Sequence, residues 1–174
     1  PNTQVDYPIA HTSEDDENYY LDRDIYKQYL FAGTIYSQPL NKTDFSDPVT
    51  VLYGHNMLNG TMFGDLHKFE DEEFFNKNKY FYVYTKGHIL TYEVFAASDF
   101  HNKHLLRNYD FSDKKVFNDY VNEVLSEDNY NSNIRKGVKI TEKDKLLVLS
   151  TCSNYNKNSR YLVQGVLVDD EFTN

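Results

Sequence analysis

Cysteine is nearly absent from this chain of 174 residues, in which Cys152 is the only one. A single cysteine excludes an intrachain disulfide and a zinc site built from several thiolates. Free cysteines are among the most buried residues, so one interpretation of Cys152 is a small core side chain. The other interpretation is a reactive thiol, and the neighbouring sequence has to decide between the two.

Basic residues and long apolar runs are scarce as well. The chain has 18 Lys and Arg residues against 27 Asp and Glu residues, which gives a net charge of −9. This charge would repel a phosphate backbone, so nucleic acid is not expected as a partner. No run of about 18 apolar residues occurs and no basic segment precedes a shorter apolar one, so these residues predict neither a membrane-spanning helix nor a secretory leader.

Tryptophan is missing, but 16 Tyr and 12 Phe residues make aromatic side chains frequent, which favours strands. The sequence has no internal repeat, low-complexity tract or linker, and its length suits one core, so a single domain over residues 1–174 is expected. Runs of β-branched and aromatic residues predict strands at residues 32–36, 49–53, 81–85, 89–97, 146–151 and 161–168. The third and fourth runs, joined at Lys86 and Gly87, predict a hairpin with a tight turn.

Two helical regions are predicted between these strands. Residues 62–75 predict one or two short helices, in which the acidic residues 70–73 would suit the positive end of a helix dipole. A longer helix is predicted from Ser112, as the N-cap, to about Leu125. Its apolar side chains recur three and four residues apart, at Val116, Phe117, Tyr120, Val121, Val124 and Leu125. The sequence therefore predicts one β-rich domain with peripheral helices.

Three residues with complementary chemistry stand at strand ends. Cys152 ends one predicted strand, His55 lies just past another, and Arg160 opens the last. A thiolate nucleophile needs a base or a cation beside it, and the carbonyl that it attacks needs an oxyanion donor. The other histidines lie in polar contexts and are not expected to act chemically: His11, His67, His88, His101 and His104. No metal-ligand spacing is found, so neither a metal nor a cofactor is expected.

Two motifs resemble those of a known family. YGHNM at residues 53–57, followed by TMF at 61–63, resembles a segment of class B sortases, and LSTC at 149–152 with Arg160 resembles their C-terminal signature. The likeness extends over residues 5–168. It implies a mainly β fold, a sortase-type closed β-barrel of about eight strands, with peripheral helices that include the Ser112 helix inserted between two late strands. An N-terminal membrane anchor and a leading helix are expected to lie outside these residues.

The resemblance also implies an activity and a location. Class B sortases are cysteine transpeptidases that cleave an Asn-Pro-x-Thr-Asn-like sorting signal after Thr and transfer the thioacyl intermediate to a peptidoglycan amine. Such an enzyme would work, most simply as a monomer, at the extracellular face of the cytoplasmic membrane or in the cell wall of a Gram-positive bacterium. Its partners would be surface proteins that carry the signal and the peptidoglycan precursor or cross-bridge amine.

Carried onto this chain, the resemblance makes Cys152 the nucleophile, His55 the acid and base, and Arg160 the oxyanion and signal clamp. Five further residues are expected to bind the signal, with core packing or loop polarity as their alternative roles: Leu21, Asn102, Leu106, Ser150 and Thr151. Two positions depart from the family pattern, Val148 where many members have Thr and Asn154 where some have Asp.

Other functions stay open at this stage. A pilin-polymerising sortase has the same motifs, while another cell-wall cysteine peptidase is disfavoured because His55 precedes Cys152. A binding domain that keeps the fold without catalysis is disfavoured by the presence of all three candidate catalytic residues. The sequence leaves open the signal, the acceptor amine, the oligomeric state and the role of Asn154 and the loop at residues 153–159.

Overall fold

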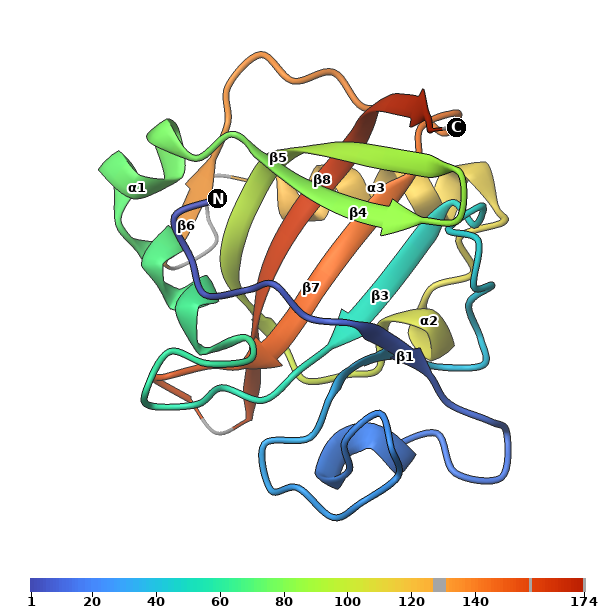
Figure 1. Cartoon of the computed structure of the whole chain (residues 1–174). Coiled ribbons are helices and arrows are strands. Elements are labelled where there is room, and N and C mark those ends of the chain that lie inside the picture. The colour runs from blue at the N-terminus through green and yellow to red at the C-terminus, as the bar shows by residue number, and fades with distance from the viewer. Residues whose placement is uncertain (127–130, 157, 174) are drawn as a thin grey trace.

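Eight strands form one sheet in the computed structural model, which describes residues 1–126, 131–156 and 158–173. The strands are β1 Ile9–His11, β2 Ile35–Ser37, β3 Val49–Tyr53, β4 Tyr80–Thr85, β5 His88–His101, β6 Ser132–Ile134, β7 Leu146–Cys152 and β8 Ser159–Phe172. Their order is β1-β2-β3-β7-β8-β5-β4, and β6 pairs with β5 off this path (Figure 1). All neighbours are antiparallel except β1 with β2 and β3 with β7.

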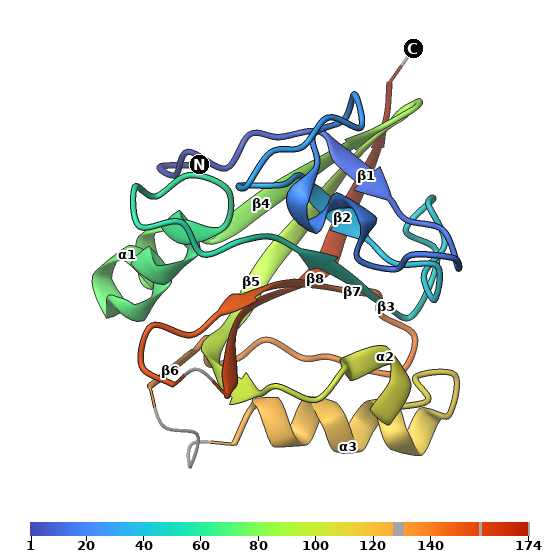
Figure 2. The same cartoon turned by 90° about the horizontal axis from the view of Figure 1, so that it is seen from below.

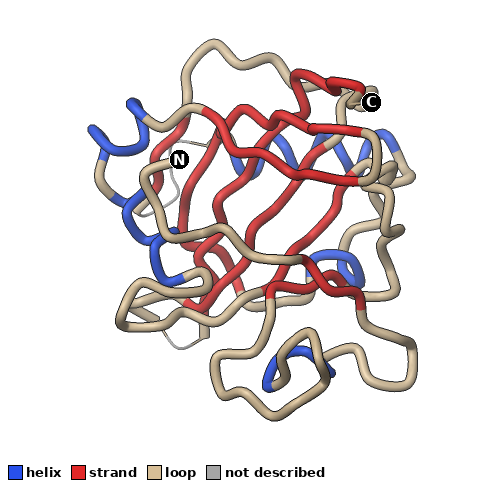
Figure 3. Tube along the Cα trace, in the orientation of Figure 1, coloured by secondary structure: helices blue, strands red, loops and turns tan. Residues whose placement is uncertain are grey.

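Short helices surround this sheet (Figure 3). They are the 3-10 helices η1 Tyr19–Asp22 and η2 Gly64–Glu70 and the α-helices α1 Glu72–Lys77, α2 Leu105–Asn108 and α3 Lys114–Val124. In Figure 2, α2 and α3 lie together below the part of the sheet formed by β3, β7 and β8, and the strands β1, β2 and β4 of the same curved sheet lie above it. Over the described residues, no helix combines the length and the apolar character that crossing a bilayer requires.

Most predicted elements are present, with some changes in extent. β3 has the predicted bounds, and the β4–β5 hairpin turns at Gly87 with φ +84°. The region predicted to be helical at 62–75 contains η2 and the start of α1, which runs two residues further, to Lys77. β2 begins later than predicted, because Gly33 at φ +61° turns the chain there and donates its N–H to the Leu30 carbonyl at 2.8 Å. β5 and β8 are longer than predicted, at 14 residues each, since they pair with each other over almost their whole length.

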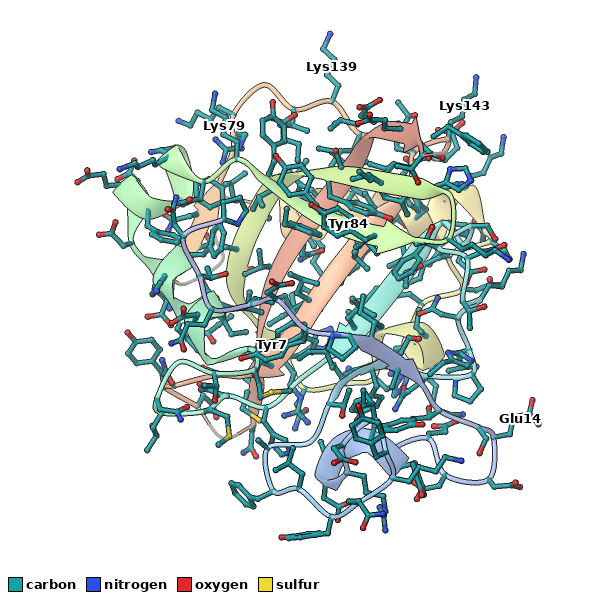
Figure 4. All side chains as sticks on the ribbon, viewed as in Figure 1. Tyr7, Glu14, Lys79, Tyr84, Lys139 and Lys143 are labelled. Carbon is teal, nitrogen blue, oxygen red and sulfur yellow. The ribbon has the colours of Figure 1, made fainter. Side chains whose placement is uncertain are left out.

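The mainly β class and the strand number are confirmed, but the predicted closure of the barrel is not. Among the described residues the ladder ends at β1 on one side and at β4 on the other. Pro8, which precedes β1, has no N–H to extend a ladder. A pocket of about 660 Å³ opens between the N-terminal segment and β4, and Tyr7 and Tyr84 line its two borders (Figure 4).

Two apolar cores lie on the two faces of the sheet, and β7 contributes to both. Leu147 and Leu149 belong to the core enclosed by the curved sheet, whereas Leu146 and Val148 belong to the core between the sheet and α3. This alternation follows from the two-residue period of a strand. Burial on both faces explains why β7 is a continuous apolar run in the sequence.

The inserted helix α3 lies between β5 and β7 in the chain, as predicted, and buries the predicted face. Its four fully packed residues are Phe117, Tyr120, Val121 and Val124. The predicted N-cap is wrong by one residue. Asp113 caps the helix by accepting from the main-chain N–H groups of Lys115 and Val116, at 2.7 and 3.2 Å, while the Ser112 hydroxyl donates to Asp110 at 2.6 Å. One oxygen of the adjacent carboxylate, Asp113 Oδ1, accepts from both N–H groups, and its negative charge suits the positive helix end, so Asp113 takes the place of the serine as the cap.

We expect Asp113→Ala to lower the free energy of unfolding by about 1 kcal/mol, because it leaves helix N–H groups without their acceptor. Ser112→Ala, the matched control one residue earlier, should cost clearly less. Urea unfolding of both variants measures the difference, and a larger loss in Ser112→Ala would restore the serine as the cap.

Candidate active site

The pairing of β7 with β8 places Cys152 opposite Arg160. The two residues are register partners at the ends of antiparallel strands, and the Arg160 guanidinium Nη1 donates to the Cys152 sulfur at 3.0 Å. Cys152 is exposed to solvent, so its sulfur is accessible to a reactant. Residues 153–158 connect the strands, and residue 157 of this loop lies outside the described residues. The Arg160 guanidinium therefore places a hydrogen-bond donor and a positive charge directly at the sulfur.

The parallel pairing of β3 with β7 brings the segment that bears His55 to the same end of the sheet. Tyr53 is the register partner of Ser150, and the next residue, Gly54, donates its N–H to the Ser150 carbonyl at 3.2 Å. The Thr151 hydroxyl donates to the Gly54 carbonyl at 2.8 Å. A Cβ at Gly54 would lie 2.5 Å from the Ile35 side chain, so glycine lets the chain pass here.

The orientation of His55 depends on the loop that precedes β2. Its Nε2 lies 2.7 Å from the main-chain oxygen of Leu21, and its ring stacks on Phe31 with centroids 6.0 Å apart. A carbonyl oxygen only accepts, so Nε2 is assigned a proton. The segment between β1 and β2 therefore supplies two contacts to the histidine ring, one from η1 and one from the loop that follows it.

A second histidine, His67, contacts Cys152, although its polar sequence context predicted no chemical role. His67 Nε2 lies 2.9 Å from the Cys152 main-chain oxygen, and its Nδ1 lies 2.5 Å from a Glu70 carboxylate oxygen. Asn56 donates to the same Cys152 oxygen at 3.1 Å and to Asn154 at 2.8 Å. The one available sequence signal was the spacing of His67 and Glu70, since residues three apart share a helix face.

The candidate signal-binding residues fall into two groups. Leu21 is 40% exposed beside His55, and Asn102 is exposed just past the β5 residue that pairs with Ser159. Leu106 packs against the core beside α3, and Ser150 and Thr151 are only 5% and 2% exposed. Three of the five thus take part in packing or main-chain support in this structure.

The positive charge of Arg160 affects the pKa of two tyrosines with buried hydroxyls, Tyr36 on β2 and Tyr53 on β3. Burial raises the pKa of Tyr36 to about 12, and the nearby Arg160 partly opposes this shift. Burial likewise raises the pKa of Tyr53, again against the effect of Arg160. Both phenols therefore stay neutral at physiological pH and can act as hydrogen-bonding groups, as Tyr36 does by donating to Asn18 at 3.1 Å. Among the described residues no group of three or more His, Cys, Asp or Glu could hold a metal ion.

Comparison with known proteins identifies the family of this chain. A family model described as the sortase domain matches residues 1–168. The chain belongs to the sortase family, in its class B. Its relatives include the sortase B of Listeria monocytogenes, 35% identical over 96% of this chain and 66% of that protein, and the sortase B of Staphylococcus aureus, 25% identical over 92% and 64%. The chain thus spans just under two thirds of the length of these relatives.

Solved class B sortases have the same fold. The structure of Clostridium perfringens sortase B aligns with a TM-score of 0.84 and 31% identity over 97% of this chain and 90% of that one. A class B sortase of Streptococcus pyogenes involved in pilus biogenesis aligns with a TM-score of 0.80 and 28% identity over 96% and 88%. The recognition of a class B sortase from its motifs is therefore confirmed.

We expect Thr151→Val to destabilise this sortase by about 1 kcal/mol, because the Gly54 carbonyl loses its donor. The control is Thr12→Val, since Thr12 is a similarly buried hydroxyl that also donates to main-chain carbonyls. Urea unfolding should show similar losses in both variants. NMR signals of the His55 ring should shift only in Thr151→Val, and unchanged signals there would show that this hydrogen bond does not hold the His55 segment.

Proposed function

We propose that this chain is the catalytic part of a cysteine transpeptidase that cleaves an Asn-Pro-x-Thr-Asn-like sorting signal after Thr and transfers the acyl group to a peptidoglycan amine. The observation that carries the proposal is the 3.0 Å contact between the Arg160 guanidinium and the exposed Cys152 sulfur, with His55 on the neighbouring strand end. Membership of the sortase family supports the reaction class.

In the first half-reaction the Cys152 thiolate attacks the Thr carbonyl carbon and forms a C–S bond. The carbonyl oxygen becomes an oxyanion, for which the Arg160 guanidinium supplies N–H donors and positive charge. His55 then gives a proton to the departing nitrogen, the C–N bond breaks, and the C-terminal part of the signal leaves as an amine. A thioacyl enzyme remains.

In the second half-reaction an amine of the peptidoglycan stem or cross-bridge attacks the thioester carbonyl. His55, now neutral, takes the proton of the attacking nitrogen, and the thiolate of Cys152 departs. The product is an amide between the surface protein and the cell wall. The pairing of Cys152 with Arg160 is restored for the next signal.

The exposed side chains beside the candidate catalytic residues support a signal-binding role for Leu21 and Asn102. Leu106, Ser150 and Thr151 would contribute by shaping the groove from within, since they are half-buried or buried. We place the enzyme in the cell envelope, with wall anchoring as its main role. Polymerisation of pilins is the alternative role, favoured by the likeness to the streptococcal enzyme involved in pilus biogenesis.

Cys152→Ala should abolish both cleavage and transfer, because no other thiol is present in the chain. Unfolding should change little, since the side chain is exposed. Mass spectrometry of an Asn-Pro-x-Thr-Asn peptide incubated with and without a wall-type amine identifies both products. Turnover by the alanine variant equal to that of the parent would reject Cys152 as the nucleophile.

Arg160→Lys should be nearly as damaging as Arg160→Ala, because lysine offers a point charge where arginine offers a planar fork of donors. Loss of an oxyanion donor lowers kcat on the order of 100-fold to 1,000-fold in other acyl-transfer enzymes, and we expect that scale here. Steady-state kinetics of both variants on the signal peptide test this. A fully active lysine variant would show that charge alone is sufficient.

A further inference from the structure

Two hydrogen-bond donors converge on the main-chain oxygen of Cys152. His67 Nε2 lies 2.9 Å from it and Asn56 Nδ2 lies 3.1 Å from it. A carbonyl oxygen has two lone pairs, so both donors can bind at once. These contacts come from η2 and from the segment after β3, and neither belongs to the ladder of β7.

His67 is itself held on three sides. Its Nδ1 faces a Glu70 oxygen at 2.5 Å, its ring stacks on Tyr161 with centroids 4.6 Å apart, and its side chain is 9% exposed. Because the Cys152 oxygen can only accept a hydrogen bond, Nε2 must carry a proton. The carboxylate of Glu70 at the other ring nitrogen fixes the orientation of the ring. The imidazole thus has one available position.

Glu70 also connects η2 to the loop after Cys152. Its second carboxylate oxygen accepts from the Tyr155 hydroxyl at 2.9 Å. The Asn133 amide, on β6, donates to the main-chain oxygens of Phe69 and Glu70 at 2.8 and 3.0 Å, which fixes the end of η2. Through these hydrogen bonds, β6 holds η2 in place, and η2 in turn contacts both Cys152 and the loop that follows it.

Such support matters because Cys152 is the last residue of β7 and is exposed, whereas Thr151 before it is buried. Strand ends open more readily than strand centres. A displacement of about 1 Å in a reacting group can cost about 100-fold in rate. The 3.0 Å contact from Arg160 to the sulfur requires the main chain of Cys152 to stay in place.

We propose that His67, oriented by Glu70, is a positioning residue that clamps the main-chain oxygen of Cys152 and so keeps the sulfur against Arg160. This inference rests on the proposed function in one respect, which is that Cys152 is the nucleophile. His67 transfers no proton in the reaction, and its role differs from that of His55.

The test compares His67→Gln with His67→Asn. The amide nitrogen of glutamine reaches the position of Nε2 and can still donate to the Cys152 oxygen, whereas that of asparagine reaches only the position of Nδ1. Both variants lose the ring stacked on Tyr161, so their stabilities should fall alike. We expect kcat on the signal peptide to fall about ten-fold in His67→Asn with KM nearly unchanged, and glutamine to recover most of the rate.

The rate at which iodoacetamide alkylates Cys152 provides a readout that needs no peptide. His67→Asn should slow alkylation, since a displaced Cys152 loses the hydrogen-bond donor and the positive charge that the Arg160 guanidinium places at its sulfur, and His67→Gln should not. His88→Asn is the control, because His88 also pairs with a carboxylate, Asp170 at 2.7 Å, at the β4–β5 turn. It should leave both rates unchanged.

The outcomes separate the two proposals. If the parent cleaves the peptide and the glutamine and asparagine variants lose kcat and alkylation rate equally, the clamp is overturned while the proposed function stands. If no variant, the parent included, cleaves the peptide but alkylation still distinguishes asparagine from glutamine, the proposed function fails and the clamp stands.

Discussion

The two ladders of β7 determine where every candidate catalytic side chain lies. β3 pairs with it on one side and carries His55 just past its end, and β8 pairs on the other side and carries Arg160. A shift of one residue in a strand register would turn each side chain to the opposite face of the sheet. The positions of these side chains around Cys152 therefore depend first on the register of the strands and only then on the residue types.

The registry is maintained by burial on both faces of β7. Two leucines of the strand fill the core enclosed by the sheet, and the intervening residues fill the core covered by α3. A slipped register would exchange these two sets, so that each side chain would face the other core and lose the neighbours against which it packs. Within the second core the Tyr120 hydroxyl donates to Gln164 of β8 at 2.7 Å, so the inserted helix also contacts the strand that bears Arg160. The inserted helix α3 therefore packs against the strands that bear Cys152 and Arg160.

Two histidines near Cys152 differ because their partners differ. His55 is half-buried, with a main-chain oxygen at its Nε2 and an aromatic ring against its face. His67 is almost enclosed, with a carboxylate at one ring nitrogen and the cysteine main chain at the other. The same imidazole is thus suited to proton exchange with a substrate in the first setting and to holding a fixed position in the second. We assign their proposed roles on this difference.

The sequence by itself determined the elements whose cause is local. β3, the hairpin at Gly87 and the buried face of α3 follow from residue periods and a turn glycine, and the motifs around His55 and Cys152 indicated the family. Ser112 was the wrong cap because Asp113 accepts from the first N–H groups of the helix. Serine and aspartate are both preferred as N-caps, so the residue types alone do not decide between neighbours. Only the tertiary structure decided that, over the residues it describes, the ladder stays open between β1 and β4, and that His67 contacts a residue 85 positions later in the chain. Such contacts depend on how strands and loops pack in three dimensions, which no local pattern of residues encodes.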